Sequence, residues 1–258
     1  MKSRFPLHLL IVLLSVVAFN ANAQDDLFGK EEKKAPRKGW IIAFNGSFDI
    51  PGANMAKDFG LSARLGPAVY YKTENNWMFG FKTDFIFGSD IKTDSLLINV
   101  RDRYGSFLTA SGTRIGIGIY ERGYMMALEA GKIVALSESR PDNGILFLTS
   151  GGFIQHKIDI YDADSQIPQL RGDYLKGYDR LTNGLFIEEY VGYVYFSKRS
   201  VFNFHIGLDA MCGFTQDRRD YLFDVMRTDN AQRIDILFGV RGGIYIPVFK
   251  RKSEEIFY

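Results

Sequence analysis

Cysteine and proline are scarce in this 258-residue sequence, and its charges nearly cancel. A single cysteine, Cys212, excludes an internal disulfide and a cysteine-based metal cluster. With 32 Lys and Arg against 30 Asp and Glu, the chain lacks the basic field that nucleic-acid binding needs. After residue 23, no stretch approaches the roughly 18 apolar residues of a membrane-spanning helix. We therefore expect no disulfide scaffold, no nucleic-acid partner and no helical membrane domain.

The N-terminus predicts a secretory signal. Met1–Arg4 is positively charged, Leu7–Phe19 is almost entirely apolar, and Asn20–Gln24 has the small-x-small pattern that a signal peptidase cuts. The apolar run is too short to span a bilayer, which disfavours the alternative of an uncleaved anchor helix. We expect residues 1–23 to be removed after Sec-dependent export, and the charged, aperiodic residues 24–38 to form a flexible periplasmic leader.

Aromatic residues and glycine are abundant: 22 Phe, 14 Tyr and 26 Gly. This composition suits twisted antiparallel strands better than helices. From Gly39 the chain alternates with period two, so that Trp40, Phe44 and Phe48 share an apolar face whose opposite face is mixed. The same alternation recurs in seven further segments: 61–71, 77–87, 124–131, 144–160, 184–196, 202–214 and 233–249.

Alternating runs of this length fit tilted strands that cross a membrane, where only helices and closed barrels satisfy the backbone. We therefore predict an all-β, membrane-spanning antiparallel β-barrel, residues 39–258, in a Gram-negative outer membrane. A soluble β-sandwich is the alternative, but it would need a second sheet to cover the outward Phe residues.

The connections predict eight strands. Short polar turns (72–76, 140–143 and 198–200) alternate strictly with long segments (51–59, 89–123, 162–183 and 215–232). This order gives long external loops and two periplasmic termini. Thr113–Tyr120 also alternates and Glu121–Gly123 resembles a hairpin turn, but a ninth strand would put the termini on opposite sides of the membrane. We therefore assign this segment to the second external loop, as a strand that extends above the membrane, and ten strands is the alternative. We also expect a β-bulge near Gly151–Gly152, where the alternation changes phase. At the adjacent Glu188 and Glu189, we expect either that one of the two residues breaks the pattern or that another bulge is present.

Charged residues of both signs fall on the inward face. An eight-stranded barrel is just wide enough for its side chains to fill, so we expect paired charges that close the lumen rather than a diffusion pore. This predicted lumen network consists of Arg64, Lys82, Asp84, Glu129, Glu188, His205, Asp209, Asp235 and Arg241.

No catalytic or metal site stands out. His205 and Asp209 lie four residues apart on one strand, about 13 Å, too far for a hydrogen-bonded dyad. A cross-strand partner for His205, such as Asp235 or Glu188, is geometrically possible, but a buried structural histidine is the simpler interpretation. The three histidines form no cluster, so no metal or other cofactor is expected.

Arginine and tyrosine are concentrated in the predicted external loops. They are typical of binding surfaces, and they equally suit contacts between loops. The candidate loop-binding residues are Arg101, Arg103, Tyr104, Tyr178, Arg180, Arg218, Arg219 and Tyr221.

Four segments, 152–157, 175–184, 214–221 and 233–239, resemble those of poorly characterised small outer-membrane β-barrel proteins of Bacteroidota. The resemblance covers mainly the chain after Gly144. It implies the barrel fold and an envelope location, and it carries no catalytic residues.

The functional expectation is a non-enzymatic anchor or accessory subunit of an envelope assembly, secretion or uptake machine, acting through its external loops. Its expected partners are outer-membrane lipid and another outer-membrane protein. The alternatives are a rim-active enzyme on lipid or peptide, and a narrow pore.

Overall fold

The computed structural model describes residues 35–93, 96–162, 166–197, 202–228 and 230–249. The expected signal peptide and most of the expected leader therefore lie outside the described residues. Within the described ranges, no helix is long and apolar enough to cross a membrane.

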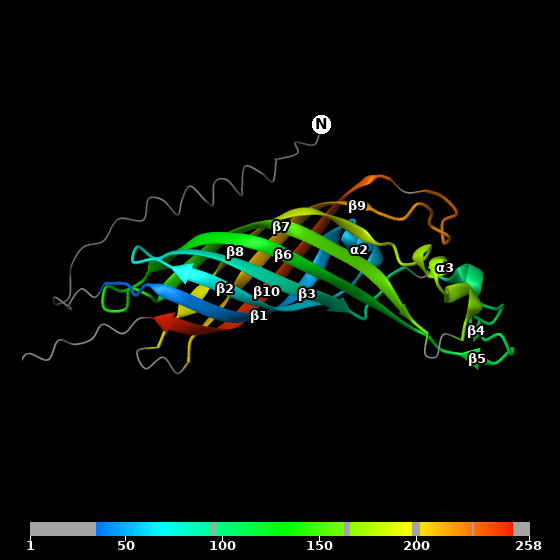
Figure 1. Ribbon diagram of the computed structural model, residues 1–258, viewed down its shortest axis with the longest axis horizontal. Coiled ribbons are helices and arrows are strands. Elements are labelled where there is room, and N and C mark those ends of the chain that lie inside the picture. Colours follow the sequence, from blue (N-terminus) through cyan, green and yellow to red (C-terminus); the bar gives the residue numbers. More distant parts are fainter. Residues whose placement is uncertain (1–34, 94–95, 163–165, 198–201, 229, 250–258) are drawn as a thin grey trace, which may run out of the picture. The chain divides into compact units, whose positions relative to one another are not determined.

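Eight long antiparallel strands close into a barrel, as predicted (Figure 1). The ring order is β1-β10-β9-β8-β7-β6-β3-β2, and the first and last strands pair from Gly39 opposite Phe249 to Ala53 opposite Asp235. The barrel strands are β1 (Gly39–Ala53), β2 (Ser62–Lys72), β3 (Trp77–Gly88), β6 (Gly118–Ala135), β7 (Gly144–Tyr161), β8 (Thr182–Tyr195), β9 (Phe204–Asp217) and β10 (Gln232–Phe249). The closed ring excludes the β-sandwich.

The two ends of the barrel differ. The turn end has the short connections 73–76, 136–143 and 196–203, together with the start of β1 and the end of β10. The loop end has 54–61, 89–117, 162–181 and 218–231. The loop end contains small elements: α2 (Met55–Asp58), η1 (Ile98–Val100), the two-stranded pair β4 (Phe107–Leu108) and β5 (Arg114–Ile115), η3 (Pro168–Leu170) and α3 (Asp173–Lys176).

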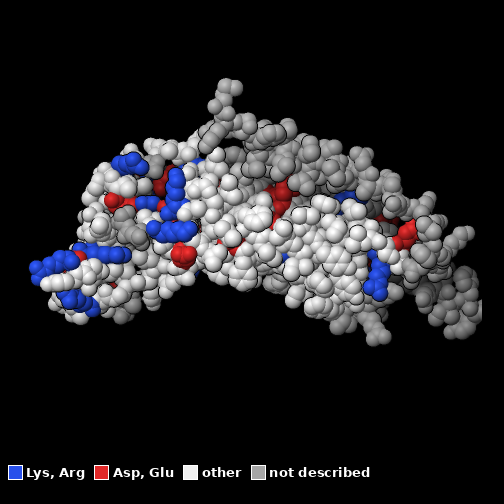
Figure 2. All heavy atoms as spheres, turned by 180° about the vertical axis from the view of Figure 1, so that it is seen from behind, with Lys and Arg blue, Asp and Glu red and all other residues white. Residues whose placement is uncertain are grey.

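The barrel wall is apolar outside and charged inside. Large outward side chains remain exposed, Phe48 to 80% and Leu128 to 71%, whereas inward Lys82 and Glu188 are fully buried. On the face in Figure 2 the wall is largely uncharged, and Lys and Arg gather at the loop end. A wall of this kind suits a hydrocarbon surround and not water.

The predicted bulge in β7 is wrong. Gly151 pairs with Leu128 and Gly152 with Ala127 in unbroken register, and even-numbered residues face inward throughout. The apparent phase change arises because the interior is apolar at Leu146 and Leu148, while the outward face becomes polar towards the loop end at Gln155 and beyond. The inward and outward faces therefore change polarity at different heights along the strand, while the pairing register of the backbone stays continuous.

Of the two alternatives at Glu188 and Glu189, the break in the pattern is confirmed and the bulge is absent. β8 pairs with β9 without interruption, so Glu188 faces the lumen and Glu189 faces outward. The outward carboxylate accepts a hydrogen bond from the Thr149 hydroxyl on β7 at 2.9 Å.

Glu121–Gly123 is not a hairpin turn. These residues lie within β6, where Glu121 pairs with Gly88 of β3 and Ile158 of β7. Of the ambiguous segment before them, only Arg114–Ile115 forms a separate strand, and Gly118–Tyr120 begins β6. The segment therefore belongs in part to a small loop hairpin and in part to β6, and the ring keeps eight strands.

Candidate functional site

Arg64 crosses the lumen at mid-height. From β2, its Nη1 donates to Glu188 Oε1 at 3.0 Å on β8, the strand diametrically opposite in the ring. Its Nε and Nη2 bind both carboxylate oxygens of Asp49 at 2.8 and 2.7 Å, and Nη2 also contacts Asp209. A guanidinium offers five donors in a fixed fork, which suits such a three-carboxylate contact.

Lys82 and Arg241 lie at the same level of the lumen as Arg64. These three cations and the carboxylates around them form what we call the charge layer. Lys82 Nζ lies 2.5 Å from Glu188 Oε2 and 3.2 Å from Asp84 Oδ2. Arg241 of β10 donates to Glu129 Oε1 at 3.1 Å, and β10 and β6 are again opposite strands. These cross-lumen bonds occupy the bore with ion pairs.

The charge layer has more acids than bases. Five buried carboxylates face three buried cations among its described residues: Asp49, Asp84, Glu129, Glu188 and Asp209 against Arg64, Lys82 and Arg241. Because an uncompensated buried charge is costly, losing a cation from this layer has a larger effect than losing an acid.

The sequence-predicted network is assembled only in part here. Seven of its nine residues lie in the charge layer, and His205 and Asp235 lie outside it. Asp49 was missed, although it lies on the inward side of the first alternating segment and could have been found from that pattern.

His205 belongs to an aromatic layer on the turn-end side of the charges. Its Nδ1 lies 2.8 Å from Tyr190 Oη, its Nε2 lies 3.0 Å from Asn45 Oδ1, and its ring stacks on Tyr245. Asp235 and Glu188, the two cross-strand partners that the sequence allowed for His205, are not among these contacts. Tyr70, Phe196 and neighbouring aliphatic side chains fill the same level, so this layer closes the bore a second time.

Asp235 instead pairs with His156, on the loop-end side. His156 Nε2 lies 3.0 Å from Asp235 Oδ2, which also accepts the Thr215 hydroxyl at 2.5 Å. All three side chains are buried, and Phe59 packs edge-on against the His156 ring. This cluster could not be found from the pattern of the strand, because the outward face becomes polar around His156 and the two faces are no longer distinct there.

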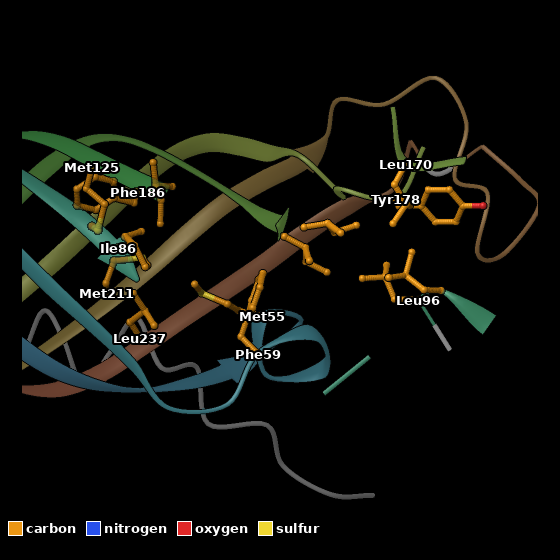
Figure 3. Close-up of a cluster of buried hydrophobic side chains, with 14 of the residues drawn as sticks. Met55, Phe59, Ile86, Leu96, Met125, Leu170, Tyr178, Phe186, Met211 and Leu237 are labelled. Carbon is orange, nitrogen blue, oxygen red and sulfur yellow. The ribbon is translucent and has the colours of Figure 1, made fainter. Parts of the chain in front are cut away.

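An apolar plug fills the barrel mouth. Figure 3 shows Met55 and Phe59, from the α2 segment, lying between two groups of side chains. One group projects from the strands into the lumen: Ile86, Met125, Phe186, Met211 and Leu237. The other comes from the loops: Leu96, Leu170 and Tyr178. The first connection thus folds inward and joins the lumen to the loops above it.

Asp58 at the end of α2 ties three parts of the chain together. Arg180 Nη1 lies 2.5 Å from its Oδ1, and Arg233 Nη2 lies 2.6 Å from its Oδ2. Arg180 also binds Asp224. Burial lowers the pKa of the Arg180 guanidinium, but Asp224 and Asp58 outweigh it and raise that pKa above its ordinary value. We call the four residues Asp58, Arg180, Asp224 and Arg233 the loop latch.

A second arginine braces the loops beside the latch. Arg219 makes a two-pronged contact with Asp179, with Nε 2.7 Å from Oδ1. Asp179 is buried, and its carbonyl accepts the Ile158 amide of β7 at 2.7 Å. Arg218 next to it donates to Asn183 Oδ1 at 2.6 Å, at the start of β8.

The β4–β5 hairpin forms a basic finger, which we define as residues 101–115. Tyr104, 63% exposed, lies between two guanidinium groups, with Arg103 4.7 Å and Arg114 4.9 Å from its ring centroid. Arg101 lies 5.3 Å from the Phe107 ring. The backbone N–H groups of Ser106 and Tyr104 hold the pKa of the Asp102 carboxyl below its ordinary value. Asp102 pairs with Arg114 at 3.3 Å.

A shallow apolar hollow lies beside the latch. It has a volume of about 410 Å³ and is lined by Pro168, Gln169, Tyr174, Tyr178, Phe223 and Met226. Tyr178 is buried edge-on against Phe223, and burial raises its pKa. Tyr174 and Met226 are widely exposed at the rim.

The eight candidate loop residues therefore divide into two groups. Tyr178, Arg180, Arg218 and Arg219 serve contacts within the loop end. The other four are Arg101, Arg103 and Tyr104 of the basic finger, and Tyr221, whose ring lies 5.8 Å from that of Phe223; all four side chains are exposed, as is Arg218. The position of a residue in its loop does not show whether it makes internal contacts, because the acids that Arg180 and Arg219 bind lie on other loops.

A clasp closes the turn end. The Asp142 carboxylate accepts hydrogen bonds from Lys72 Nζ at 2.7 Å and from Arg37 Nε at 2.6 Å. Burial alone would raise the pKa of Asp142, but the charge of Lys72 and hydrogen bonds from both cations lower it below its ordinary value. Among the residues with described side chains, no group of three His, Cys, Asp or Glu could hold a metal ion.

Comparison with solved structures finds small bacterial barrels at very low sequence identity. One is Ail, the attachment invasion locus protein of Yersinia pestis, in complex with the heparin analogue sucrose octasulfate: 10% identity and TM-score 0.45, covering 81% of this chain and 99% of that chain. Neisserial surface protein A matches at 6% identity and TM-score 0.42, covering 81% and 96%. The N-terminal β-barrel domain of Pseudomonas aeruginosa OprF matches at 10% and 0.35, covering 80% and 96%.

No family model and no curated protein matches the chain. The resemblance to a Bacteroidota family therefore stays a prediction.

Proposed function

We propose that this protein is a non-enzymatic outer-membrane barrel that anchors its loop end as a binding platform for another envelope protein. The observation that carries the proposal is the contrast between the two parts of the molecule. The bore is filled by an aromatic layer, a charge layer and an apolar plug, whereas the loop end is tied into one body with exposed Arg and Tyr side chains. The barrel acts as a support, and the loops carry recognition.

The outer membrane is the environment that suits the wall. Its outward Phe, Leu, Ile and Val side chains suit hydrocarbon, and bacterial barrels place short turns in the periplasm and long loops outside. In that orientation, the beginning of β1 and the end of β10 face the periplasm.

The geometry argues against both alternatives. A narrow pore would need a continuous hydrated path, but the cross-lumen pairs Arg64–Glu188 and Arg241–Glu129 occupy the bore. A rim enzyme would need a reachable nucleophile. The Thr215 hydroxyl beside His156 is buried and already donates to Asp235 beneath the apolar plug.

The exposed loop surface suits a protein partner with acidic and apolar groups. Arg and Tyr are enriched in interface hot spots, and the basic finger presents both. The hollow bordered by Tyr174 and Met226 can receive an apolar side chain from the same partner.

The test is site-specific photo-crosslinking in native membranes, with the photoreactive residue at position 104. We expect a discrete crosslinked protein, and we expect R101E/R103E to reduce its yield at least about tenfold, because charge reversal replaces attraction by repulsion. The matched control is Lys38→Glu at the turn end. No crosslinked protein at position 104, or equal yields from the two variants, would contradict the proposal.

A conductance measurement tests the closed bore separately. In planar bilayers, the purified protein should give no stepwise ion current, and regular steps would favour the pore.

A further inference from the structure

The barrel wall carries a groove at the loop-end edge of its apolar belt. It has a volume of about 400 Å³ and lies over β3, β6 and β7, which are neighbours in the ring. Its outward side chains are Phe85, Phe87, Arg122, Tyr124, Gln155 and Lys157.

Register places these side chains in two rows. Phe87, Arg122 and Lys157 are direct partners across the three strands, and Phe85, Tyr124 and Gln155 form the next row towards the turn end. Below them, Met126 and Phe153 continue as an apolar surface, with the Phe153 ring 6.2 Å from that of Tyr124. Arg122 and Lys157 are thus adjacent cations that border aromatic side chains on the wall, which we call the aromatic floor.

The two cations have only weak partners. Arg122 donates to its neighbouring carbonyl, Glu121 O, at 2.8 Å and lies 4.9 Å from the Tyr120 ring. Lys157 Nζ lies 3.0 Å from Asp159, with both side chains 40% exposed. Exposed ion pairs of this kind contribute little to stability, so a bound anion can displace them.

We infer that this groove binds a phosphorylated glycolipid of the outer leaflet, with its phosphate on Arg122 and Lys157 and an acyl chain along Phe85, Phe87 and Tyr124. The inference rests on the proposed outer-membrane placement. Charge complementarity selects the head group, because two directly adjacent cations, with one exposed acid beside Lys157 on the loop-end side, suit a dianionic phosphate. The aromatic floor selects the lipid over a free phosphate, since a soluble anion gains nothing from it.

Another cation at the opposite edge of the belt provides a matched control. Lys132 also faces outward from β6, and its Nζ lies 5.5 Å from the Trp77 ring centroid. It pairs across the strands with Trp77 and Phe147. Lys132 thus resembles Lys157 in charge and aromatic surroundings but has no neighbouring arginine.

Native mass spectrometry of the full chain in detergent tests the inference, with bis-phosphorylated lipid A and its dephosphorylated form as probes. We expect lipid A to bind at least about tenfold more tightly than the dephosphorylated form, and R122Q/K157Q to lose about tenfold in affinity, as expected when charge-assisted hydrogen bonds are lost. Lys132→Gln should bind like the wild type. Each variant is first checked for a folded barrel by its heat-modified gel mobility.

Equal binding of the two probes, equal losses in R122Q/K157Q and Lys132→Gln, or a second copy of the chain instead of lipid in the bound species would overturn the inference. The crosslinking at position 104 is measured on the same variants. Lost lipid binding with unchanged crosslinking supports the groove independently of the partner. Intact crosslinking without any lipid preference removes the groove and leaves the proposed function standing.

Discussion

Arg64 on β2 reaches Glu188 on the diametrically opposite strand β8, with Nη1 and Oε1 3.0 Å apart. Because side chains from opposite strands meet, the lumen of the barrel is filled at this level. The buried charge therefore stabilises the fold only as a set, because each cation compensates more than one acid.

Replacing Arg64 by Met should lower the free energy of unfolding by about 3 to 5 kcal/mol, since it leaves Asp49, Glu188 and Asp209 without their shared cation. Asp209→Asn should cost about 1 kcal/mol or less, because the layer holds five acids and three bases. Urea unfolding in lipid vesicles, followed by tryptophan fluorescence, measures both. Equal losses would show that the imbalance of charge has no energetic meaning.

Arg180→Met should loosen the loop end without unfolding the barrel. The change removes the bonds of Arg180 to Asp58 and Asp224, each worth about 1.5 to 3 kcal/mol when a charged group is involved. Limited proteolysis should cleave loops 162–181 and 218–231 at least about tenfold faster, while the urea midpoint of the barrel stays unchanged. The control, Lys176→Met, breaks only the exposed pair with Asp173 and should behave like the wild type.

The turn-end clasp should make stability depend on acid. The pKa of Asp142 is lowered in the folded protein, so its stabilisation is fully present above the unfolded value near pH 4 and is lost as pH falls through the folded value. We expect the wild type to exceed Asp142→Asn by about 2 kcal/mol at pH 7. In urea titrations, this difference should shrink only below about pH 4. A difference that stays constant down to pH 2.5 would contradict the assignment.

Glu189 is a carboxylate on the outward, apolar face, and its described partner is the Thr149 hydroxyl. If the wall faces lipid alone, Glu189→Gln should be neutral or should stabilise the barrel by up to about 1 kcal/mol in vesicles, because charge on the lipid face is unfavourable. A loss of stability in native membranes together with a gain in pure lipid would instead place a protein against β7 and β8.

Sequence alone predicted the wall well and the interior contacts poorly. Period two determines which way each side chain points, so segments such as 77–87 and 233–249 matched β3 and β10 to within about one residue. Pairing within the lumen depends also on the height of each residue, which strand register sets. His156 and Asp235 meet because β7 and β10 bring them to one level, and nothing in either strand alone indicates this.

The same limit explains the wrong bulge at Gly151–Gly152 and the different contacts of the loop arginines. Alternation predicts a bulge at Gly151–Gly152 only if the inward face is polar along the whole strand, whereas both ends of this lumen are apolar. Arg180 and Arg101 look alike in sequence, but only Arg180 finds acids on two other loops.

The seam between β1 and β10 has a consequence for synthesis. Gly39 lies opposite Phe249, and more than 200 residues separate the two in sequence. The first strand to be synthesised can therefore pair on this side only after the last strand has been made. Until that closure, both edges are open and the Arg64–Glu188 bridge has no sealed interior in which to form. Closure is therefore a single late event, which makes this a slowly folding topology and one whose unfinished chain needs protection from edge-to-edge aggregation.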